Sequence, residues 1–451
     1  MNSWAKAIIC SVAVQQYAAA QYIDLTFNPG TGLQNGSAKV FANLPDGRII
    51  IGGDFSAYNG TMRRSVARLE ADGTLDTTFD PMEGPNGSVS WVFPQPDGKL
   101  IIVGDFTAFN SLPRQLITRL RVDGSVDLSF PVIAPNGSFS TAASQPDGRI
   151  LVAGSFTQIN GTNRVNLARL NSNGTLDLSF MAPSGVAGRV NGLIPSQGGT
   201  TLAYGNFTSI GGVMRPMLAR LNDNGTVDTN FALPLVNGTE ITAALEQPDG
   251  KIVIAGYFTS IDGYSRLRVA RLNSDGSLDF SFYTPLGVTD PPYFLSGQAD
   301  GKTLLGGSFF YVGGVAQLYL ARLNANGTFD PTFNPVLNGG PSAIRGQSDG
   351  TVLLSGGFSR VNGTNINRIV RLTGDATVPP QSSLLSARLY PAVFVQGTTG
   401  INYRVEYVNN LTNAGMWTPL TNLTLTTSPY LLLDTTWTNS RQRFYRALTL
   451  P

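Results

Sequence analysis

The chain has 451 residues, of which 42% are hydrophobic and 13% are charged, and its formal net charge is +2. This composition excludes a disordered chain, and the small net charge gives no electrostatic basis for binding nucleic acid. With no histidine and a single cysteine, Cys10, the sequence also excludes histidine-dependent catalytic dyads, intramolecular disulfides and thiolate metal sites.

The first 20 residues have the order of a secretory signal peptide. Lys6 precedes the short apolar run "AIICSVAV", and the small residues "AAA" come just before Gln21. No other stretch approaches the roughly 20 apolar residues that cross a membrane. The sequence therefore predicts an exported protein, secreted or at the cell surface, without a membrane span and with a candidate signal peptide at residues 1–20.

A unit of about 50 residues recurs seven times between residues 21 and 375. Its clearest copy, residues 145–180, reads "QPDGRILVAGSFTQINGTNRVNLARLNSNGTLDLSF". The glycine of its first turn is found at Gly47, Gly98, Gly148, Gly199, Gly250, Gly301 and Gly350. A repeat of this length indicates one supersecondary unit per copy, so the fold is built from seven similar parts.

Each unit is predicted to contain four antiparallel strands. Apolar runs such as residues 99–106, "KLIIVGDF", are bounded by Asp-Gly and are rich in isoleucine and valine. Residues 166–170 and 175–180 read as two strands joined at Asn-Gly, a dipeptide that favours a type I′ turn. Four-stranded units of this length favour a β-propeller, and an open solenoid with polar caps is the alternative.

The two ends of the repeat region decide between these folds. The aspartate of the last predicted strand recurs at Asp24, Asp76, Asp127, Asp177, Asp228, Asp279 and Asp330. The first copy, in "QYIDLTFNPG", has no unit before it, and the seventh unit has no such strand after Arg371. We predict that residues 22–27 complete the blade begun by residues 341–372. The predicted fold is an all-β, seven-bladed propeller closed by this N-terminal strand, which leaves no exposed edge there.

Two further positions recur seven times and are predicted to be structural. The aromatic residues of Gly-x-Phe are expected to fill the space between neighbouring blades. Their positions are Phe55, Phe106, Phe156, Phe207, Phe258, Phe309 and Phe358. The arginines of the third strand are expected to pair with the repeated aspartates, within or between blades. They are Arg68, Arg119, Arg169, Arg220, Arg271, Arg322 and Arg371.

Together, Gln-Pro-Asp-Gly-Lys/Arg, Gly-x-Phe, Ala-Arg-Leu, Asp/Asn-Gly and Leu-Asp-x-x-Phe resemble the repeats of the bacterial "delta sixty" family over about residues 22–375. The fourth unit departs most, with "SQGGTTLAYGNF" in place of Pro-Asp-Gly. The resemblance implies a propeller in a secreted or surface bacterial protein. It brings no catalytic residues to this chain.

The repeat ends in a polar, proline-containing linker at residues 376–384, and residues 385–451 are predicted to form a small C-terminal β-sandwich. The segment "YRVEYVNNLTNAGMWTPL" and a later "FYRA" resemble the fibronectin-like modules of exported bacterial proteins. This resemblance rests on Tyr403, Trp417, Phe444 and Tyr445. It implies a role in attachment or spacing, and a purely stabilising appendage is the alternative.

No P-loop, dinucleotide fingerprint or nucleophile elbow is present, and we predict no catalytic residues, metal ligands or cofactors. The Asp-Gly turn at residues 273–279 supplies few of the six to eight oxygens that calcium requires, so it is expected to be a hairpin turn. The sequons at Asn59, Asn160 and Asn362 are likewise expected to be turns rather than glycan sites.

The candidate ligand site lies where the innermost strands meet the axial mouth. Aligning the units places one polar column there, consisting of Lys39, Ser90, Ser140, Asn191, Thr242, Tyr293 and Ser342. The column is rich in hydroxyls and holds no pair of carboxylates. It is interpreted either as solvated strand ends or as a shallow site for a sugar or peptide. Glu83, Glu240 and Asp290 lie in nearby loops, but their spacing does not favour a glycosidase-like pair.

Aromatic residues give a second candidate site. Tyr293 and Phe294 lie in "DPPYFLSG", and Trp91 and Phe93 lie in "VSWVFPQ". Rings flanked by hydroxyls suit the faces of sugars, and packing in the core is the alternative.

The sequence favours a non-enzymatic binding or structural scaffold outside the cell, with a protein or a polysaccharide at the cell surface as its partner. One alternative is a carbohydrate-binding propeller or, less favoured, a carbohydrate-cleaving one. Another is a self-assembling fibre subunit, in which residues 22–27 insert into the seventh blade of a neighbouring chain.

Overall fold

The computed structural model describes residues 22–180, 185–196, 198–374, 392–409, 417–426, 428, 430–433 and 443–450. Every helix or strand assigned in these residues is a β-strand. The chain divides into two compact units, Met1–Pro379 and Pro380–Pro451. The candidate signal peptide at residues 1–20 and the predicted linker at residues 376–384 lie outside the described residues.

Each repeat forms one antiparallel sheet, called a blade here, in which the second strand lies between the first and the third. Blade 3 consists of β12 (Ser138–Ser144), β13 (Ile150–Ser155) and β16 (Leu167–Leu170). Blades 1 and 2 consist of β2 (Ala38–Asn43), β3 (Ile49–Gly53) and β6 (Val66–Leu69), and of β7 (Ser88–Pro94), β8 (Leu100–Asp105) and β11 (Ile117–Leu120). Blades 4 and 5 consist of β18 (Val190–Pro195), β19 (Thr201–Gly205) and β22 (Leu218–Leu221), and of β23 (Val236–Glu246), β24 (Ile252–Ile261) and β26 (Val269–Leu272). Blades 6 and 7 consist of β27 (Pro292–Gly297), β28 (Thr303–Gly307) and β31 (Leu320–Leu323), and of β32 (Pro341–Gly346), β33 (Val352–Gly356) and β36 (Ile369–Leu372).

A short hairpin connects the second and third strands of each blade. These hairpins are formed by β4 (Ala57–Tyr58) and β5 (Thr61–Met62), β9 (Ala108–Phe109) and β10 (Leu112–Pro113), β14 (Gln158–Ile159) and β15 (Thr162–Asn163), β20 (Ser209–Ile210) and β21 (Val213–Met214), β29 (Tyr311–Val312) and β30 (Val315–Ala316), and β34 (Arg360–Val361) and β35 (Thr364–Asn365). In blade 5, β24 itself continues to pair with β25 (Tyr264–Ser265). Two more short strands, β1 (Leu33–Gln34) and β17 (Val186–Ala187), add to the hairpins of blades 1 and 4. Asn59, Asn160 and Asn362 lie in the hairpin turns with φ of 47°, 50° and 49°, so the turn prediction for these sequons is confirmed.

The fourth strand predicted for each blade is reduced to a single bridge. In blade 3, Leu176 forms an isolated bridge with Leu170, and the chain then turns. The turn begins at Asp177, whose carboxylate accepts hydrogen bonds from the backbone N–H (2.9 Å) and the hydroxyl (2.6 Å) of Ser179. Such a side-chain bond competes with strand pairing, which explains why the extended segment is so short.

The hairpin before this bridge is also different from the type I′ turn that Asn-Gly suggested. Gly174 has a φ of 91°, and its N–H donates to the carbonyl of Asn171 at 2.8 Å. Asn173 is not among the residues with positive φ, whereas a type I′ turn requires positive φ at both central positions. The geometry is a three-residue loop in which glycine alone takes the left-handed conformation.

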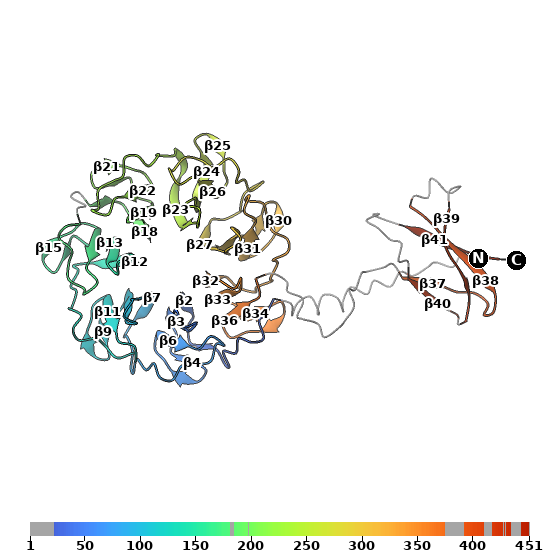
Figure 1. Cartoon of the computed structure of the whole chain (residues 1–451), viewed down its shortest axis with the longest axis horizontal. Helices are drawn as coiled ribbons and strands as arrows, with labels where there is room; N and C mark the ends of the chain where they lie inside the picture. Colours follow the sequence, from blue (N-terminus) through green and yellow to red (C-terminus); the bar gives the residue numbers. More distant parts are fainter. Residues whose placement is uncertain are drawn as a thin grey trace. The chain divides into compact units, whose positions relative to one another are not determined.

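The seven blades are arranged in a ring, with their first strands nearest its centre (Figure 1). Each first strand contacts the first strands of the blades before and after it, and β32 of blade 7 contacts β2 of blade 1. An open solenoid is therefore wrong for this chain, because its first and last units would lie apart.

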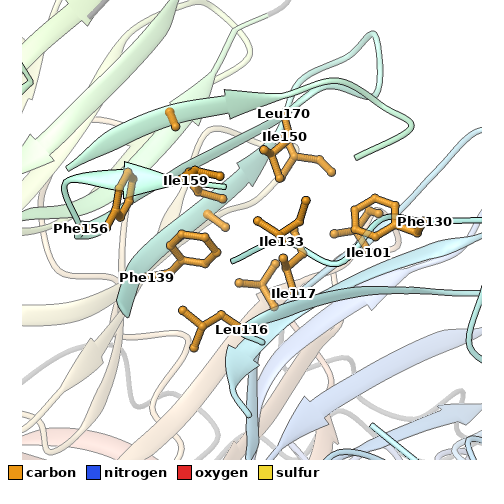
Figure 2. Close-up of a cluster of buried hydrophobic side chains, with 14 residues drawn as sticks. Ile101, Leu116, Ile117, Phe130, Ile133, Phe139, Ile150, Phe156, Ile159 and Leu170 are labelled. Carbon is orange, nitrogen blue, oxygen red and sulfur yellow. The ribbon is translucent and has the colours of Figure 1, made fainter. Parts of the chain in front are cut away.

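Seven buried apolar clusters in the described part of this unit each join two neighbouring blades. Figure 2 shows the cluster between blades 2 and 3, where Ile101 and Ile117 pack with Ile150 and Phe156. The seven Gly-x-Phe rings are distributed one to each cluster, so their predicted position between blades is confirmed.

Residues 22–27 lie against the third strand of blade 7. Ile23 forms a bridge with Leu372, and the N–H of Asp24 donates to the carbonyl of Arg371 at 2.9 Å. The ring of Tyr22 meets the ring of Phe333 edge-on at 5.9 Å between centroids. The bridge and the backbone hydrogen bond are of the same kind that Leu176 and Asp177 make inside blade 3.

The second unit contains two antiparallel sheets in its described residues. In one, β38 (Asn402–Val408) pairs with β39 (Thr418–Thr424) and β41 (Phe444–Thr449); in the other, β37 (Ala392–Val395) pairs with β40 (Tyr430–Leu433). Val395, Tyr403, Val405 and Leu425 form its buried cluster. Apolar residues from both sheets therefore share one core.

Candidate functional site

The repeated arginines and aspartates form one ion pair in every blade. The arginine Nε lies 2.6–2.9 Å from the aspartate Oδ2 in all seven pairs. Six pairs are separated by eight residues, as in Arg169–Asp177, whereas the seventh joins Arg371 to Asp24 across 347 residues. The predicted pairing is confirmed, and it occurs within blades.

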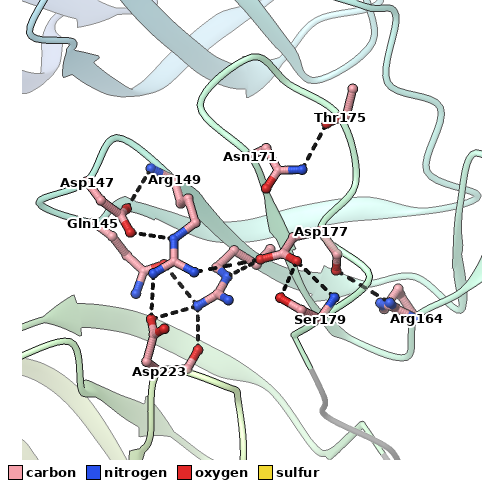
Figure 3. Close-up of polar contacts among 10 residues, drawn as sticks. Gln145, Asp147, Arg149, Arg164, Asn171, Thr175, Asp177, Ser179 and Asp223 are labelled. Atoms are coloured by element: carbon pink, nitrogen blue, oxygen red, sulfur yellow. Dashed lines mark hydrogen bonds and ion pairs between the residues drawn. The ribbon is translucent and has the colours of Figure 1, made fainter.

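The same arginines also connect each blade to the next one. Nη1 of Arg220 donates to the carbonyl of Ser274 at 2.6 Å, and Nη1 of Arg371 donates to the carbonyl of Ala71 at the same distance. Each guanidinium lies 4.6–5.2 Å from the centroid of a phenylalanine ring in its own blade. Figure 3 shows the polar network between blades 3 and 4, where Nη2 of Arg149 donates to the Asp223 carboxylate at 2.7 Å. These side chains hold the ring together.

The electrostatics of the repeated aspartates suit this structural role. Burial opposes ionisation of Asp330, but hydrogen bonds from Thr332 and Lys302 and the charge of Arg322 outweigh it and lower the pKa of Asp330 to about 2. Asp76 follows the same pattern, with its pKa lowered by Thr78 and Arg68. Carboxyls that stay ionised at neutral pH are poor general acids, so this set offers no acid catalyst.

Every residue of the predicted axial column occupies a β-bulge in the first strand of its blade. The strand register shifts on either side of Lys39, Ser90, Ser140, Asn191, Thr242, Tyr293 and Ser342. A bulged residue is unpaired in its own ladder, which frees its side chain and backbone for other contacts.

Four of these side chains bond the backbone of the next blade. The hydroxyls of Ser140, Thr242 and Ser342 donate to the carbonyls of residues 190, 292 and 38 at 2.7, 2.6 and 2.7 Å. The amide of Asn191 donates to the carbonyl of Ile241 at 3.0 Å. In these four blades the column is part of the interface between neighbours.

Lys39 pairs with Asp54 of its own blade at 3.3 Å, and further polar contacts of the column lie at blades 4 to 6. Asn191 also donates to Oε1 of Glu240 at 2.7 Å, and Glu240 is paired across the sheet with Tyr257. The hydroxyl of Tyr257 lies 3.0 Å from that of Tyr293 in the next blade. We call Asn191, Glu240, Tyr257 and Tyr293 the axial cluster.

The surroundings of Tyr293 favour its protonated form. The hydrogen bond from Tyr257, followed by burial and the charges of Asp290 and Glu240, raises the pKa of Tyr293 to about 12. Glu240 lies opposite Tyr257, which contacts Tyr293, and Asp290 comes three residues before Tyr293 in the chain. Glu83 lies apart from them, where its carboxylate accepts a hydrogen bond from Ser111 at 3.1 Å.

Tyr257 was missed by the sequence prediction. It occupies the variable position of Gly-x-Phe, where the other units have Asp54, Asp105, Ser155, Asn206, Ser308 and Gly357. The signal was present, because a large aromatic residue replaces small or acidic ones at this position in one unit alone.

The two aromatic segments chosen from the sequence have different environments. Trp91 and Phe93 are partly buried and pack against the cluster between blades 2 and 3, so the core-packing alternative holds for them. Tyr293 is 45% exposed, and Phe294 is half-buried.

The exposed aromatic side chains in the described part of the chain all belong to blades 5 and 6 and the connection between them. They are Tyr257, Tyr264, Phe280, Tyr283, Tyr293, Phe310 and Tyr311, with exposures of 39–62%. Exposed rings on neighbouring elements mark interaction surfaces on soluble proteins.

A cavity of about 380 Å³ lies at the C-terminal ends of the first strands of blades 5, 6 and 7, whereas Tyr293 of the axial cluster lies near the start of its strand. Its polar lining includes Glu246, Ser296, Gln298 and Arg345. The Glu246 carboxylate accepts a hydrogen bond from the Ser196 hydroxyl. Because Gln298 also donates to the carbonyl of Gly350 at 3.1 Å, part of this lining belongs to the contacts between blades.

The described residues contain no group of three or more aspartates, glutamates or cysteines that could hold a metal ion. Within the same residues, no helix is both long and apolar enough to span a bilayer.

A family model described as a beta-propeller domain of unknown function, DUF5122, matches seven segments of the chain. They are residues 44–79, 95–130, 145–180, 199–231, 247–282, 298–333 and 347–378. The chain belongs to the DUF5122 beta-propeller family. No curated protein matches its sequence.

Solved structures resemble this DUF5122 propeller at low sequence identity. The WD40 propeller domain of Doa1 is 12% identical, with 75% of this chain and 93% of that chain covered and a TM-score of 0.49. PorZ, an essential bacterial surface component of the type-IX secretion system of Porphyromonas gingivalis, is 11% identical, with coverages of 91% and 59% and a TM-score of 0.45. Puromycin hydrolase is 13% identical, with coverages of 84% and 61% and a TM-score of 0.41. These similarities concern the fold and not an activity.

The DUF5122 segments leave out most of the first strands and the connections that lead into them. Asn191, Glu240, Tyr293 and Asp290 lie between matched segments, whereas Tyr257 lies inside one. The repeated arginines and aspartates are within the matched segments, apart from Asp24. The family pattern therefore describes the scaffold, and most of the axial cluster lies outside it.

Proposed function

We propose that this DUF5122 propeller is a non-enzymatic binding scaffold, exported to the cell surface, that presents its binding face on blades 5 and 6. The observation that carries the proposal is the confinement of the exposed aromatic side chains, among the described residues, to these blades. Amphipathic rings such as those of Tyr257, Tyr293 and Tyr311 supply large contact areas at low entropic cost.

The repeated polar residues support a scaffold. Arg371, Asp24 and their six equivalents are engaged in contacts within and between blades, as are Ser140, Thr242 and Ser342. The residues that recur in the seven blades thus serve the contacts within and between blades. Binding then falls to positions at which single blades depart from the pattern.

We also propose the finer architecture as part of this function. Residues 22–27 supply the final segment of blade 7 and so close a propeller of the "delta sixty" type, with four chain segments in each blade. The Asp24–Arg371 pair at 2.6 Å and the edge contact of Tyr22 with Phe333 support this closure. The C-terminal unit is proposed to be a fibronectin-like sandwich used for attachment, supported by the core that its two sheets share.

The proposal is tested by adding purified full-length protein to washed cells of the bacterium that produces it. Wild-type protein is expected to sediment with the cells. A Tyr257→Ala/Tyr293→Ala/Tyr311→Ala variant is expected to stay in the supernatant, while a Leu128→Ala/Leu178→Ala control on blades 2 and 3 behaves as wild type. Both leucines are well exposed, at 65% and 69%, so the control removes apolar surface of a similar kind. Sedimentation of the tyrosine variant with the cells contradicts the proposal.

Self-assembly by strand exchange is the second candidate, and the separation of Asp24 from its partner Arg371 by 347 residues favours it. The N–H of Asn28 donates to the carbonyl of Asp72 in blade 1 at 2.5 Å, so exchange requires blades 7 and 1 to separate. Light scattering gives the test. Polymers that fall to monomers when residues 1–28 are deleted support exchange, and a monomeric full-length chain at high concentration overturns it.

A further inference from the structure

The axial cluster contains hydrogen-bond acceptors that the protein itself does not use. The amide of Asn191 donates to Oε1 of Glu240. No hydrogen bond or ion pair within the described residues reaches Oε2 of Glu240. Asp290, half-buried and three residues before Tyr293 in the chain, has no hydrogen bond or ion pair from its carboxylate among the described residues either. Half-buried carboxylate oxygens favour a ligand that brings hydrogen-bond donors.

The nearby charges disfavour an anionic ligand and are compatible with neutral donors. Glu240 and Asp290 would repel an anion. The guanidinium of Arg268, 5.7 Å from the centroid of the Tyr257 ring, offsets part of their negative charge and so weakens the attraction for a cation. Hydroxyl groups donate to carboxylates without bringing either charge.

The rings beside these acceptors add an apolar surface. Tyr257 and Tyr293 are 39% and 45% exposed and meet at their hydroxyl groups, so each ring keeps an accessible part beside a carboxylate. A sugar presents a face of C–H groups together with hydroxyls along its edge. Aromatic rings pack against the face while carboxylates and amides accept from the hydroxyls.

Further rings continue outward along blade 6. The backbone N–H groups of Phe310 and Tyr311 both donate to the Thr289 hydroxyl, at 2.9 and 3.1 Å, which fixes this turn next to Asp290. Both side chains are 50% exposed. In Figure 1, β27, which carries Tyr293, lies near the centre of the ring, and β30, the partner of the strand that begins at Tyr311, lies at its rim.

We propose that blades 5 and 6 bind a neutral saccharide chain. One sugar unit lies at the axial cluster, where Glu240 and Asp290 accept its hydroxyls, and the following units pack along Phe310 and Tyr311. The proposal rests on the proposed function, in which these blades are the binding face, and it adds the chemical class of the ligand.

The test is native affinity electrophoresis of the full-length protein in gels that contain one soluble polysaccharide each. The neutral probes are a β-glucan, an α-glucan, a mannan and a xylan, and alginate is the anionic probe. Retardation by at least one neutral polysaccharide is expected. Tyr257→Ala/Tyr293→Ala is expected to weaken binding about tenfold or more, since each lost ring contact is worth about 1 kcal/mol beyond its buried area. Glu240→Gln is expected to weaken it as well, because an amide is a poorer acceptor than a carboxylate.

Leu128→Ala/Leu178→Ala is the control. Both leucines are well exposed, at 65% and 69%, and they lie on blades 2 and 3, outside the proposed binding face. This variant is expected to bind as wild type, and thermal melting of all variants confirms that they are folded.

Three results overturn the saccharide proposal: no retardation by any probe, retardation by alginate alone, or equal retardation of wild type and Tyr257→Ala/Tyr293→Ala. The first result, combined with tyrosine-dependent sedimentation with cells, leaves the binding face standing and removes only the ligand class. Failure of both assays removes the binding face as well.

Discussion

The interface between blades 7 and 1 and the interface between blades 3 and 4 are built from equivalent parts. Arg371 pairs with Asp24 and donates to the carbonyl of Ala71, just as Arg169 pairs with Asp177 and donates to the carbonyl of Asp223. Phe27 and Phe180 occupy equivalent places in the buried clusters of the two interfaces. Ser342 and Ser140 each donate to the next blade at 2.7 Å.

The difference between the two interfaces lies in the chain that connects their parts. Eight residues separate Arg169 from Asp177, whereas 347 separate Arg371 from Asp24. By loop-closure entropy, bringing the distant pair together costs about 3 kcal/mol more. The comparison teaches that a blade can have the same contacts whether or not its segments are adjacent in the chain. The entropic cost of forming those contacts, however, is higher when the segments are far apart.

Removing residues 1–27 is expected to have the largest effect. The change deletes the buried Phe27 ring and leaves the Arg371 guanidinium without its carboxylate, a combined loss of about 5 kcal/mol or more. The urea midpoint of the propeller should fall sharply, and a synthetic peptide of residues 21–30 should restore part of it. An unchanged midpoint would show that the blade 7 contacts contribute nothing to stability.

Phe27→Ala and Phe180→Ala are expected to destabilise the ring to a similar extent, each by about 3–5 kcal/mol. Both side chains are almost fully buried, at 6% and 3% exposure, so each truncation removes apolar contacts from a buried cluster. Chemical denaturation measures both. A much smaller loss for Phe27→Ala would mean that the interface between blades 7 and 1 is looser than the interface between blades 3 and 4.

Asp24→Asn and Asp177→Asn are expected to differ. Burial opposes ionisation of both aspartates, but the hydrogen bonds from Thr26 or Ser179 and from the paired arginine lower their pKa values below the usual 3.8. Their stabilisation is therefore complete above about pH 4 and is lost as the pH falls through the lowered folded-state values. At pH 7 each variant should lose about 1–3 kcal/mol, and Asp177→Asn should lose more because Arg169 is 1% exposed whereas Arg371 is 12% exposed.

The measurement for this pair is the urea midpoint between pH 7 and pH 2. The curves of wild type and variant should converge at the acid end of the range. Parallel curves would contradict the assignment of the effect to the ionised carboxylate.

Ser342→Ala and Ser140→Ala are expected to have the smallest effect, about 1 kcal/mol each, because one hydrogen bond between blades is lost. A double variant should show additive losses, since the two sites lie in different blades. A larger-than-additive loss would reveal coupling around the ring.

Repetition explains what the sequence predicted well. Asp24 and Asp177 occupy the same motif, so comparing the copies was enough to assign Asp24 to the blade of Arg371. The Gly-x-Phe rings were placed between blades by the same reasoning, because a residue type kept in every copy reflects the common architecture. The fourth strand was predicted too long, since the bond from Ser179 to the Asp177 carboxylate competes with extension of the strand.

The candidate site was harder to predict because it depends on departures from repetition. A β-bulge leaves no clear mark in residues 138–144, "SFSTAAS", so the contact of Ser140 with the next blade could not be read from its column. Tyr257 and Tyr293 lie 36 residues apart in neighbouring blades, so no spacing within one unit predicts the contact between their hydroxyls. Whether the axial column itself binds a ligand stays a prediction.

Each blade donates a hydrogen bond from its arginine to the next blade and accepts one at a backbone carbonyl from the previous blade. If an identical unit were inserted between two blades, every arginine would still face a carbonyl of the following blade. Duplication of the corresponding gene segment therefore leaves no interface without its partner. The number of blades in such a chain is then limited by the angle between neighbouring blades, which must close the ring, and not by a need for new types of contact.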